Sequence, residues 1–186
     1  MATARDRKRL PEVRAWAAGL GLALGLAVTT ALPAEERTLD LGGGKSLRYA
    51  LLDPGKDPGS ARATALVILR HLAEGKIGEA AQLSNAPARR EEVLRDYQAS
   101  VGEEEFKRVF SQYLDSSNGV VAEAAIGAHR LIIWRLAGQD QQLAGQFYIE
   151  IGGKFLLDDV PSETRANLRR VLQSYRKAAT ASERKD

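Results

Sequence analysis

The sequence predicts an α+β domain in which helices pack on a curved, cone-like antiparallel sheet, with an N-terminal hairpin and a C-terminal helix. Apolar residues recur at helical spacing through residues 61–114, which indicates several amphipathic helices. Beyond residue 119 the pattern changes to apolar, β-branched and alternating segments separated by short glycine turns. Since consecutive strands joined by short turns pair antiparallel, we expect an antiparallel sheet in preference to parallel βαβ units.

A hairpin begins the folded part of the chain. Thr38–Leu41 and Leu47–Leu52 have the pattern of strands, and Gly42–Ser46 lies between them. Glycine adopts positive φ without steric cost, so this segment suits a tight turn. It also contains Gly-Lys-Ser, but a phosphate-binding loop needs another glycine where Leu39 stands, and a helix directly afterwards. We therefore interpret it as a turn, followed by a linker at Asp53–Gly59.

Four helices are expected next, and most have a recognisable beginning. Ser60 is a suitable N-cap for the first helix, and Asn85 with Pro87 suits the cap and first turn of the third. Glu103–Glu105 lie on the first turn of the fourth, where the helix dipole favours negative charge. The predicted ranges are residues 61–75, 77–83, 87–101 and 103–114.

The second half of the chain predicts three further strands and a last helix. The middle strand alternates, which leaves Tyr148 on a polar face that we expect to meet solvent. Ser162 is a suitable N-cap for the last helix. The predicted strands are residues 120–136, 143–151 and 154–159, separated by turns at 138–141 and 152–153.

Residues 1–34 have the layout of an export signal. A basic head precedes an uncharged apolar run at residues 15–31, and small residues and a return of polarity follow. The run is shorter than the ~20 residues of a typical spanning helix, so a cleaved signal is the preferred interpretation. An uncleaved inner-membrane anchor, with the domain facing outward, and a buried core helix stay open as alternatives. The basic residues are Arg5, Arg7, Lys8, Arg9 and Arg14.

Without this leader the protein is formally neutral. Removing its five Lys/Arg and two Asp/Glu from the totals of 27 and 24 leaves 22 of each. A neutral domain gives no argument for binding nucleic acid.

The absence of cysteine excludes a lipoprotein anchor, disulfides and thiolate metal sites, and no other spacing predicts a metal or cofactor. The chain divides into a leader or anchor at 1–34, a hairpin and linker at 35–60, an α+β domain at 61–177 and a flexible tail at 178–186.

Two helical segments and two strands carry a family resemblance: Leu72–Gly75, Lys76–Ser84, Gly145–Ile151 and Lys154–Asp159. Their order and spacing resemble the helical opening and closing strands of the nuclear-transport-factor-2-like family, also called cystatin-like or ketosteroid-isomerase-like, over roughly residues 61–160. The resemblance implies a cone-shaped sheet around a cleft, which in the isomerases holds an ionisable Asp, His or Tyr. The N-terminal hairpin and the C-terminal helix depart from the family's pattern.

Four side chains are candidates for lining a ligand cleft: His129, Trp134, Tyr113 and Phe147. Aromatic residues commonly wall such clefts, although for Trp134 core packing is the preferred interpretation and a cleft wall is the alternative. His129 is a candidate because imidazole is a common acid–base group, and it shares a strand face with apolar neighbours. Tyr148 and Asp115 are weaker acid–base candidates, because we expect the first in solvent and the second in a turn. His71 is expected on the solvated side of its helix.

No catalytic constellation stands out, so the preferred function is an exported, non-enzymatic envelope module that binds a protein partner or a small apolar ligand. One alternative is a small isomerase or dehydratase in the same cone. Another is a membrane-tethered structural component of an envelope complex. The expected location is periplasmic or extracellular, or the inner membrane facing outward. Membrane association through residues 15–31 and homo-oligomer formation stay open.

A fusion of residues 1–36 to a reporter tests the leader. We expect the reporter to be exported and the mature protein to begin near Leu32 or Glu35, because small residues precede both positions. Replacing Leu22 and Leu26 by Arg interrupts the apolar run and should keep the reporter inside the cell. A wild-type fusion retained in the cytosol would contradict the prediction, and an exported protein that still begins at Met1 would identify the anchor.

Overall fold

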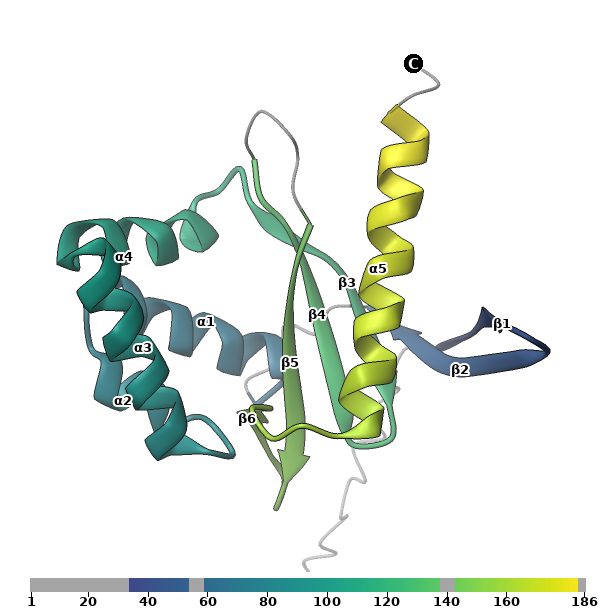
Figure 1. The fold of residues 1–186 in the computed structure, drawn as a ribbon, viewed down its shortest axis with the longest axis horizontal. Coiled ribbons are helices and arrows are strands. Elements are labelled where there is room, and N and C mark those ends of the chain that lie inside the picture. Colours follow the sequence, from purple (N-terminus) through teal and green to yellow (C-terminus); the bar gives the residue numbers. More distant parts are fainter. Residues whose placement is uncertain (1–33, 54–58, 138–142, 184–186) are drawn as a thin grey trace, which may run out of the picture. The chain divides into compact units, whose positions relative to one another are not determined.

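The computed structural model describes residues 34–53, 59–137 and 143–183, whose arrangement Figure 1 shows. The predicted leader up to residue 33, most of the linker and the turn at 138–141 fall outside them. Within the described ranges, no helix has both the length and the apolar character to cross a membrane. The strands are β1 Glu35–Gly42, β2 Lys45–Leu52, β3 Gly119–Ile126, β4 His129–Arg135, β5 Leu143–Ile151 and β6 Lys154–Leu157. The helices are α1 Ala61–Ala73, α2 Ile77–Ala81, α3 Pro87–Val101, α4 Glu103–Ser111, the 3-10 turn η1 Gln112–Leu114 and α5 Glu163–Glu183.

The strands form one antiparallel sheet in chain order, from β1 at one edge to β6 at the other. The sheet is curved and unclosed, and the predicted α+β class with its N-terminal hairpin and C-terminal helix is confirmed (Figure 1). One turn was not predicted. Residues 120–136 form two strands, because the chain reverses at Gly127, which has a φ of 57°. This left-handed conformation favours glycine over other residues.

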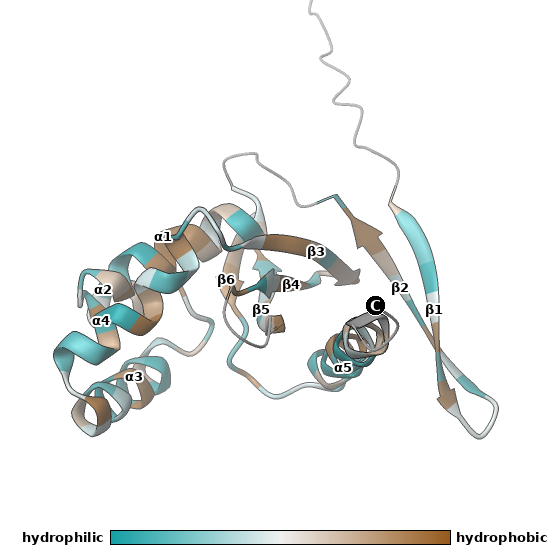
Figure 2. Cartoon of the chain, turned by 90° about the horizontal axis from the view of Figure 1, so that it is seen from above, coloured by the Kyte–Doolittle hydropathy of each residue, from teal (hydrophilic) through white to brown (hydrophobic). Residues whose placement is uncertain are grey.

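Two strand pairings are short and leave part of a neighbouring strand uncovered. β2 pairs with β3 only over Ala50–Leu52, and the rest of the β1–β2 hairpin extends away from β3 (Figure 2). β6 pairs with β5 only over Tyr148–Ile151. Residues 143–146 of β5 therefore have no strand beside them on this side among the described residues, and form an open edge beyond the end of β6.

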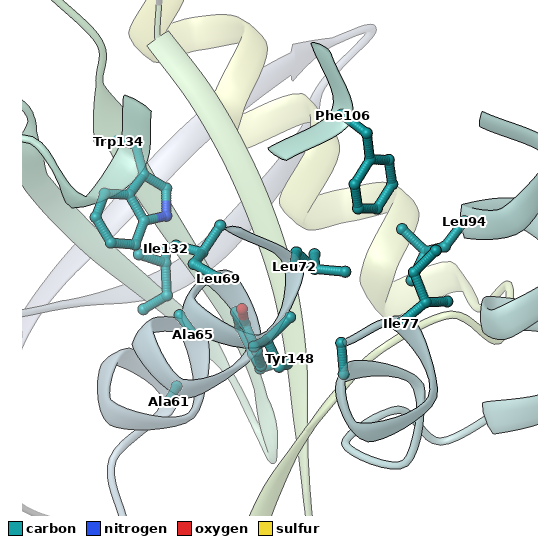
Figure 3. Close-up of a cluster of buried hydrophobic side chains, with 12 residues drawn as sticks. Ala61, Ala65, Leu69, Leu72, Ile77, Leu94, Phe106, Ile132, Trp134 and Tyr148 are labelled. Carbon is teal, nitrogen blue, oxygen red and sulfur yellow. The ribbon is translucent and has the colours of Figure 1, made fainter. Parts of the chain in front are cut away.

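Each face of the sheet has its own hydrophobic cluster. On one face, Ile132, Trp134 and Tyr148 pack against α1 and the helices that follow it (Figure 3). On the other face, Leu131 and Ile133 pack against α5. The α5 residues in that cluster are Leu168, Val171 and Leu172. The expectation that Tyr148 meets solvent is wrong: its side chain is fully buried, because helices cover both faces of β5.

The helix boundaries follow the predicted caps in two places and differ in two others. Ser60 and Ser162 cap α1 and α5 as predicted, each accepting a main-chain hydrogen bond of 3.1 Å. Asn85 does not cap α3, since its side chain bonds across to the residues after β6. The C-terminal helix continues to Glu183 instead of giving way to a flexible tail at residue 178, because its last turns are rich in alanine, the strongest helix former.

Gly145 lets α5 approach the sheet closely. A Cβ atom at this position would lie 2.5 Å from Cδ2 of Leu172 and 3.1 Å from Cδ1 of Leu131. Both leucines are buried in the cluster under α5, so neither has free space to move into. The missing side chain at Gly145 therefore sets the distance between β5 and α5.

Replacing Gly145 by Ala should lower the free energy of unfolding by about 1–3 kcal/mol, because adding a methyl group to a filled core forces its neighbours to shift. Gly119→Ala, at the start of β3, is the matched control. A Cβ there would meet none of the described atoms within 4 Å, so this variant should keep or slightly raise stability. Urea denaturation compares the two, and equal stabilities would contradict the close packing of α5 on Gly145.

Candidate functional site

A cavity of about 260 Å³ lies where helices α1–α4 meet the open edge of β5. One wall comes from the helices and is apolar except for Arg90 of α3. The other comes from β5, the end of β6 and the first turn of α5, and carries most of the polar groups. The lining residues are Ile68, Leu72, Ala80, Arg90, Leu94, Phe110, Gly145, Gln146, Phe147, Leu157, Asp158 and Arg165. An apolar wall facing a few polar groups is the usual character of a small-molecule site.

The apolar wall continues the core between α1 and the sheet. Ile68 and Leu72 lie about one turn apart on α1 and are almost completely buried. Leu94 is the buried residue of α3, and Phe110 packs edge-on against Phe106 with ring centroids 4.9 Å apart. Because these side chains also belong to or pack against the core cluster, packing holds the wall in place.

Gln146 supplies an amide to the sheet side of the cavity, and two buried donors fix its orientation. Nε1 of Trp134 donates to Oε1 of Gln146 at 3.0 Å, and the hydroxyl of Tyr148 donates to the same oxygen at 3.1 Å. An indole N–H can only donate, so the contacted atom is the amide oxygen. Burial raises the pKa of the Tyr148 phenol far above its ordinary value, which keeps that hydroxyl protonated. No acceptor among the described residues bonds the remaining –NH₂ group of Gln146.

Arg165 brings a positive charge to the same cavity from the first turn of α5. The central carbon of its guanidinium lies 5.5 Å from the centre of the Phe147 ring, within cation–π range. Its Nε is buried without a hydrogen-bond partner, and no carboxylate of the described ranges forms an ion pair with it. A buried donor without an acceptor is unfavourable, so this guanidinium is the least compensated polar group of the site.

Two consecutive carboxylates, Asp158 and Asp159, tie the helices to the end of β6. Asp159 accepts hydrogen bonds from Nε and Nη2 of Arg90, the first at 2.7 Å, and from the hydroxyl of Ser84 at 2.7 Å. The side chains of Arg90 and Asp159 are only 25% and 9% exposed. A bidentate pair shielded in this way is stronger than an ordinary surface ion pair.

Asp158 is buried, and both of its carboxylate oxygens are occupied. Nδ2 of Asn85 donates to Oδ1 at 2.9 Å, and Nδ1 of His129 lies 3.1 Å from Oδ2. The main chain joins the same elements, because the N–H of Asn85 donates to the carbonyl of Leu157, whose own N–H donates to the carbonyl of Leu83. We call Ser84, Asn85, Arg90, Asp158 and Asp159 the carboxylate clamp.

The structure separates the predicted site residues. Phe147 lines the cavity. Trp134 is 2% exposed and fills the core, and Tyr113 stacks edge-on against it with ring centroids 5.6 Å apart. His129 is not among the lining residues and touches the site only through Asp158. Trp134 likewise contributes only through its hydrogen bond to Gln146.

Sequence reasoning missed Gln146, Arg165 and the clamp. Gln146 stood on the strand face that we expected to meet solvent, and Arg165 occupies an ordinary polar position of an amphipathic helix. Asp115 does accept hydrogen bonds within its turn, as expected, with the N–H of Ser117 at 2.8 Å. The expectation that His71 is solvated is wrong, because the residue is half-buried and its Nδ1 is buried without a partner among the described atoms.

A second hollow of about 880 Å³ lies between the β1–β2 hairpin and α5. Its lining includes the exposed charged residues Asp40, Lys45, Glu163, Arg170 and Lys177. A hollow with such a lining is a polar surface groove and lacks the apolar enclosure of a ligand pocket.

Within the part of the chain that the structure describes, no three His, Asp or Glu side chains gather closely enough to hold a metal ion. Comparison of the chain with protein-family models, with curated proteins and with solved structures found no match. The resemblance to the nuclear-transport-factor-2-like family therefore stays a prediction, and the cavity is interpreted from its own chemistry.

Proposed function

We propose that this protein is a non-enzymatic binding module that holds a small, mainly apolar molecule in the cavity at the open edge of β5. The observation that carries the proposal is the cavity itself, whose volume of about 260 Å³ is bounded by buried aliphatic side chains and by the half-buried rings of Phe110 and Phe147. This is just below the usual range of about 300–1,000 Å³ for ligand pockets. If each non-hydrogen atom needs the ~30 Å³ that a water molecule occupies, the ligand has about nine such atoms.

Catalysis by an isomerase or dehydratase needs an ionisable group whose reactive atom faces the ligand. Asp158 lines the cavity, but Asn85 and His129 already occupy its oxygens. The hydroxyl of Ser84 donates to Asp159 and not to a histidine, so it lacks the base that activates a serine nucleophile. These contacts favour binding over catalysis.

The location of the proposed activity depends on the leader. Because residues 1–34 predict export, we propose that the ligand is met in the periplasm or outside the cell. A role as a membrane-tethered component of an envelope complex requires that the leader be retained, so the mature N-terminus distinguishes the two.

Isothermal titration calorimetry with an eight-carbon panel of 1-octanol, octanoate and octylamine tests the proposal. At least one should bind the wild type and raise its Tm, because a ligand that binds only the folded state stabilises it. Ala80→Leu should abolish that binding, since Ala80 is 1% exposed and lines the cavity, which the larger side chain would fill.

Ala99→Leu, the same change at an exposed position of α3, is the matched control and should bind as the wild type does. Far-UV circular dichroism establishes that both variants are folded at the titration temperature. The proposal fails if none of the three probes binds the wild type, or if a folded Ala80→Leu variant binds as well as the control.

A further inference from the structure

We infer that the ligand is an apolar monocarboxylic acid, whose carboxylate meets Arg165 and Gln146 while its hydrocarbon body lies against the helices. This inference rests on the proposed function and specifies the chemistry of the same cavity. It starts from the polar groups of the lining that lack partners within the described residues.

Two side-chain donors of the cavity wall have no acceptor among the described residues. Nε of Arg165 is buried without a partner, and the amide orientation of Gln146 leaves its –NH₂ group without one. The cation–π contact with Phe147 places the guanidinium group at the wall. A guanidinium presents parallel N–H groups that match the two oxygens of a carboxylate, so this anion is the best complement.

The main chain of β5 adds a third donor. The N–H of Asp158 donates to the carbonyl of Phe147 at 2.8 Å, so the main-chain groups of Phe147 point away from β4. Main-chain direction repeats every second residue along a strand, so Gly145 points the same way. Because β6 ends opposite Tyr148, the N–H of Gly145 is directed to the open edge, where Gly145 lines the cavity.

A cationic ligand is the competing interpretation, because the negatively charged Asp158 also lines the cavity. Both oxygens of Asp158 already accept hydrogen bonds from Asn85 and His129, and those of Asp159 accept from the clamp. An ammonium group would have to share acceptors that already take hydrogen bonds, and it would be repelled by Arg165. A carboxylate instead supplies the acceptor that Arg165 lacks.

The rest of the ligand is specified by the opposite wall. Ile68, Leu72, Leu94 and Phe110 present only hydrocarbon, and burial of an alkyl chain or a ring against them is favourable. Since the cavity volume corresponds to about nine non-hydrogen atoms, octanoate, which has ten, is a probe of nearly the same size.

Titration of octanoate, 1-octanol and octylamine, at a pH where acid and amine are both ionised, tests the inference. We expect octanoate to bind the wild type about tenfold or more tightly than 1-octanol, because hydrogen bonds to charged groups are stronger than neutral ones. Arg165→Gln should weaken octanoate binding by about tenfold or more and change 1-octanol binding by no more than about twofold. Arg169→Gln, at an exposed position of the same helix, should change neither.

The outcomes separate the inference from the function on which it rests. Equal affinities for octanoate and 1-octanol, or unchanged octanoate binding by Arg165→Gln, would contradict the inference that the ligand is a carboxylate. Neither result would contradict the proposal that the protein is a binding module. If octylamine binds most tightly, the inferred carboxylate ligand is wrong and the ligand is a cation. Binding of none of the three would overturn both. Retained 1-octanol binding shows that the variant is folded, and the wild-type preference decides the question even where the variant is too unstable to titrate.

Discussion

The bonding of the carboxylate clamp to the end of β6 is the constraint on which the rest of the domain depends. Asp158 and Asp159 follow the last residue of β6, and their side chains bond to the helical layer. The main chain of Asn85 pairs with Leu157 at the same point. Strand β6 thus ends where the chain turns to the helices, so the rest of β5 has no strand on that side among the described residues, and the cavity lies there. Burial of two carboxylates is tolerable here because each is fully hydrogen-bonded.

Both helical layers contribute residues to the cavity at this open edge, and the cavity takes its mixed character from them. Helices α1–α4 provide hydrocarbon, whereas α5 packs on the opposite face and sends Arg165 to the rim. Gly145 takes part in both the core and the cavity. Its missing side chain leaves room for Leu172 on the α5 side, and the residue lines the cavity at the edge of the sheet. The same position therefore affects stability through packing and affects binding through the main chain.

Local patterns predicted most of the fold, and the failures share one physical cause. Helix caps such as Ser60 and the glycine hairpin are local signals, and both were predicted correctly. Tyr148 was misplaced because alternation alone does not reveal that helices cover both faces of a strand. The clamp could not be predicted from the sequence, because Asn85 and Asp158 are 73 residues apart and each resembles an ordinary turn residue. Only the folded structure shows that they are hydrogen-bonded. Of the predicted site, Phe147 lines the cavity, and the polar groups that define its chemistry depend on non-local contacts.

The central claim is tested most directly by a double-mutant cycle on Arg90 and Asp159, with the free energy of unfolding measured for Arg90→Met, Asp159→Asn and the double variant. A clamp that holds the helices to the end of β6 predicts a coupling energy of about 1–3 kcal/mol, because the pair is bidentate and largely shielded. The same cycle on the exposed α3 pair Arg95 and Glu91 should give a much smaller coupling. Equal coupling in the two pairs would contradict the account.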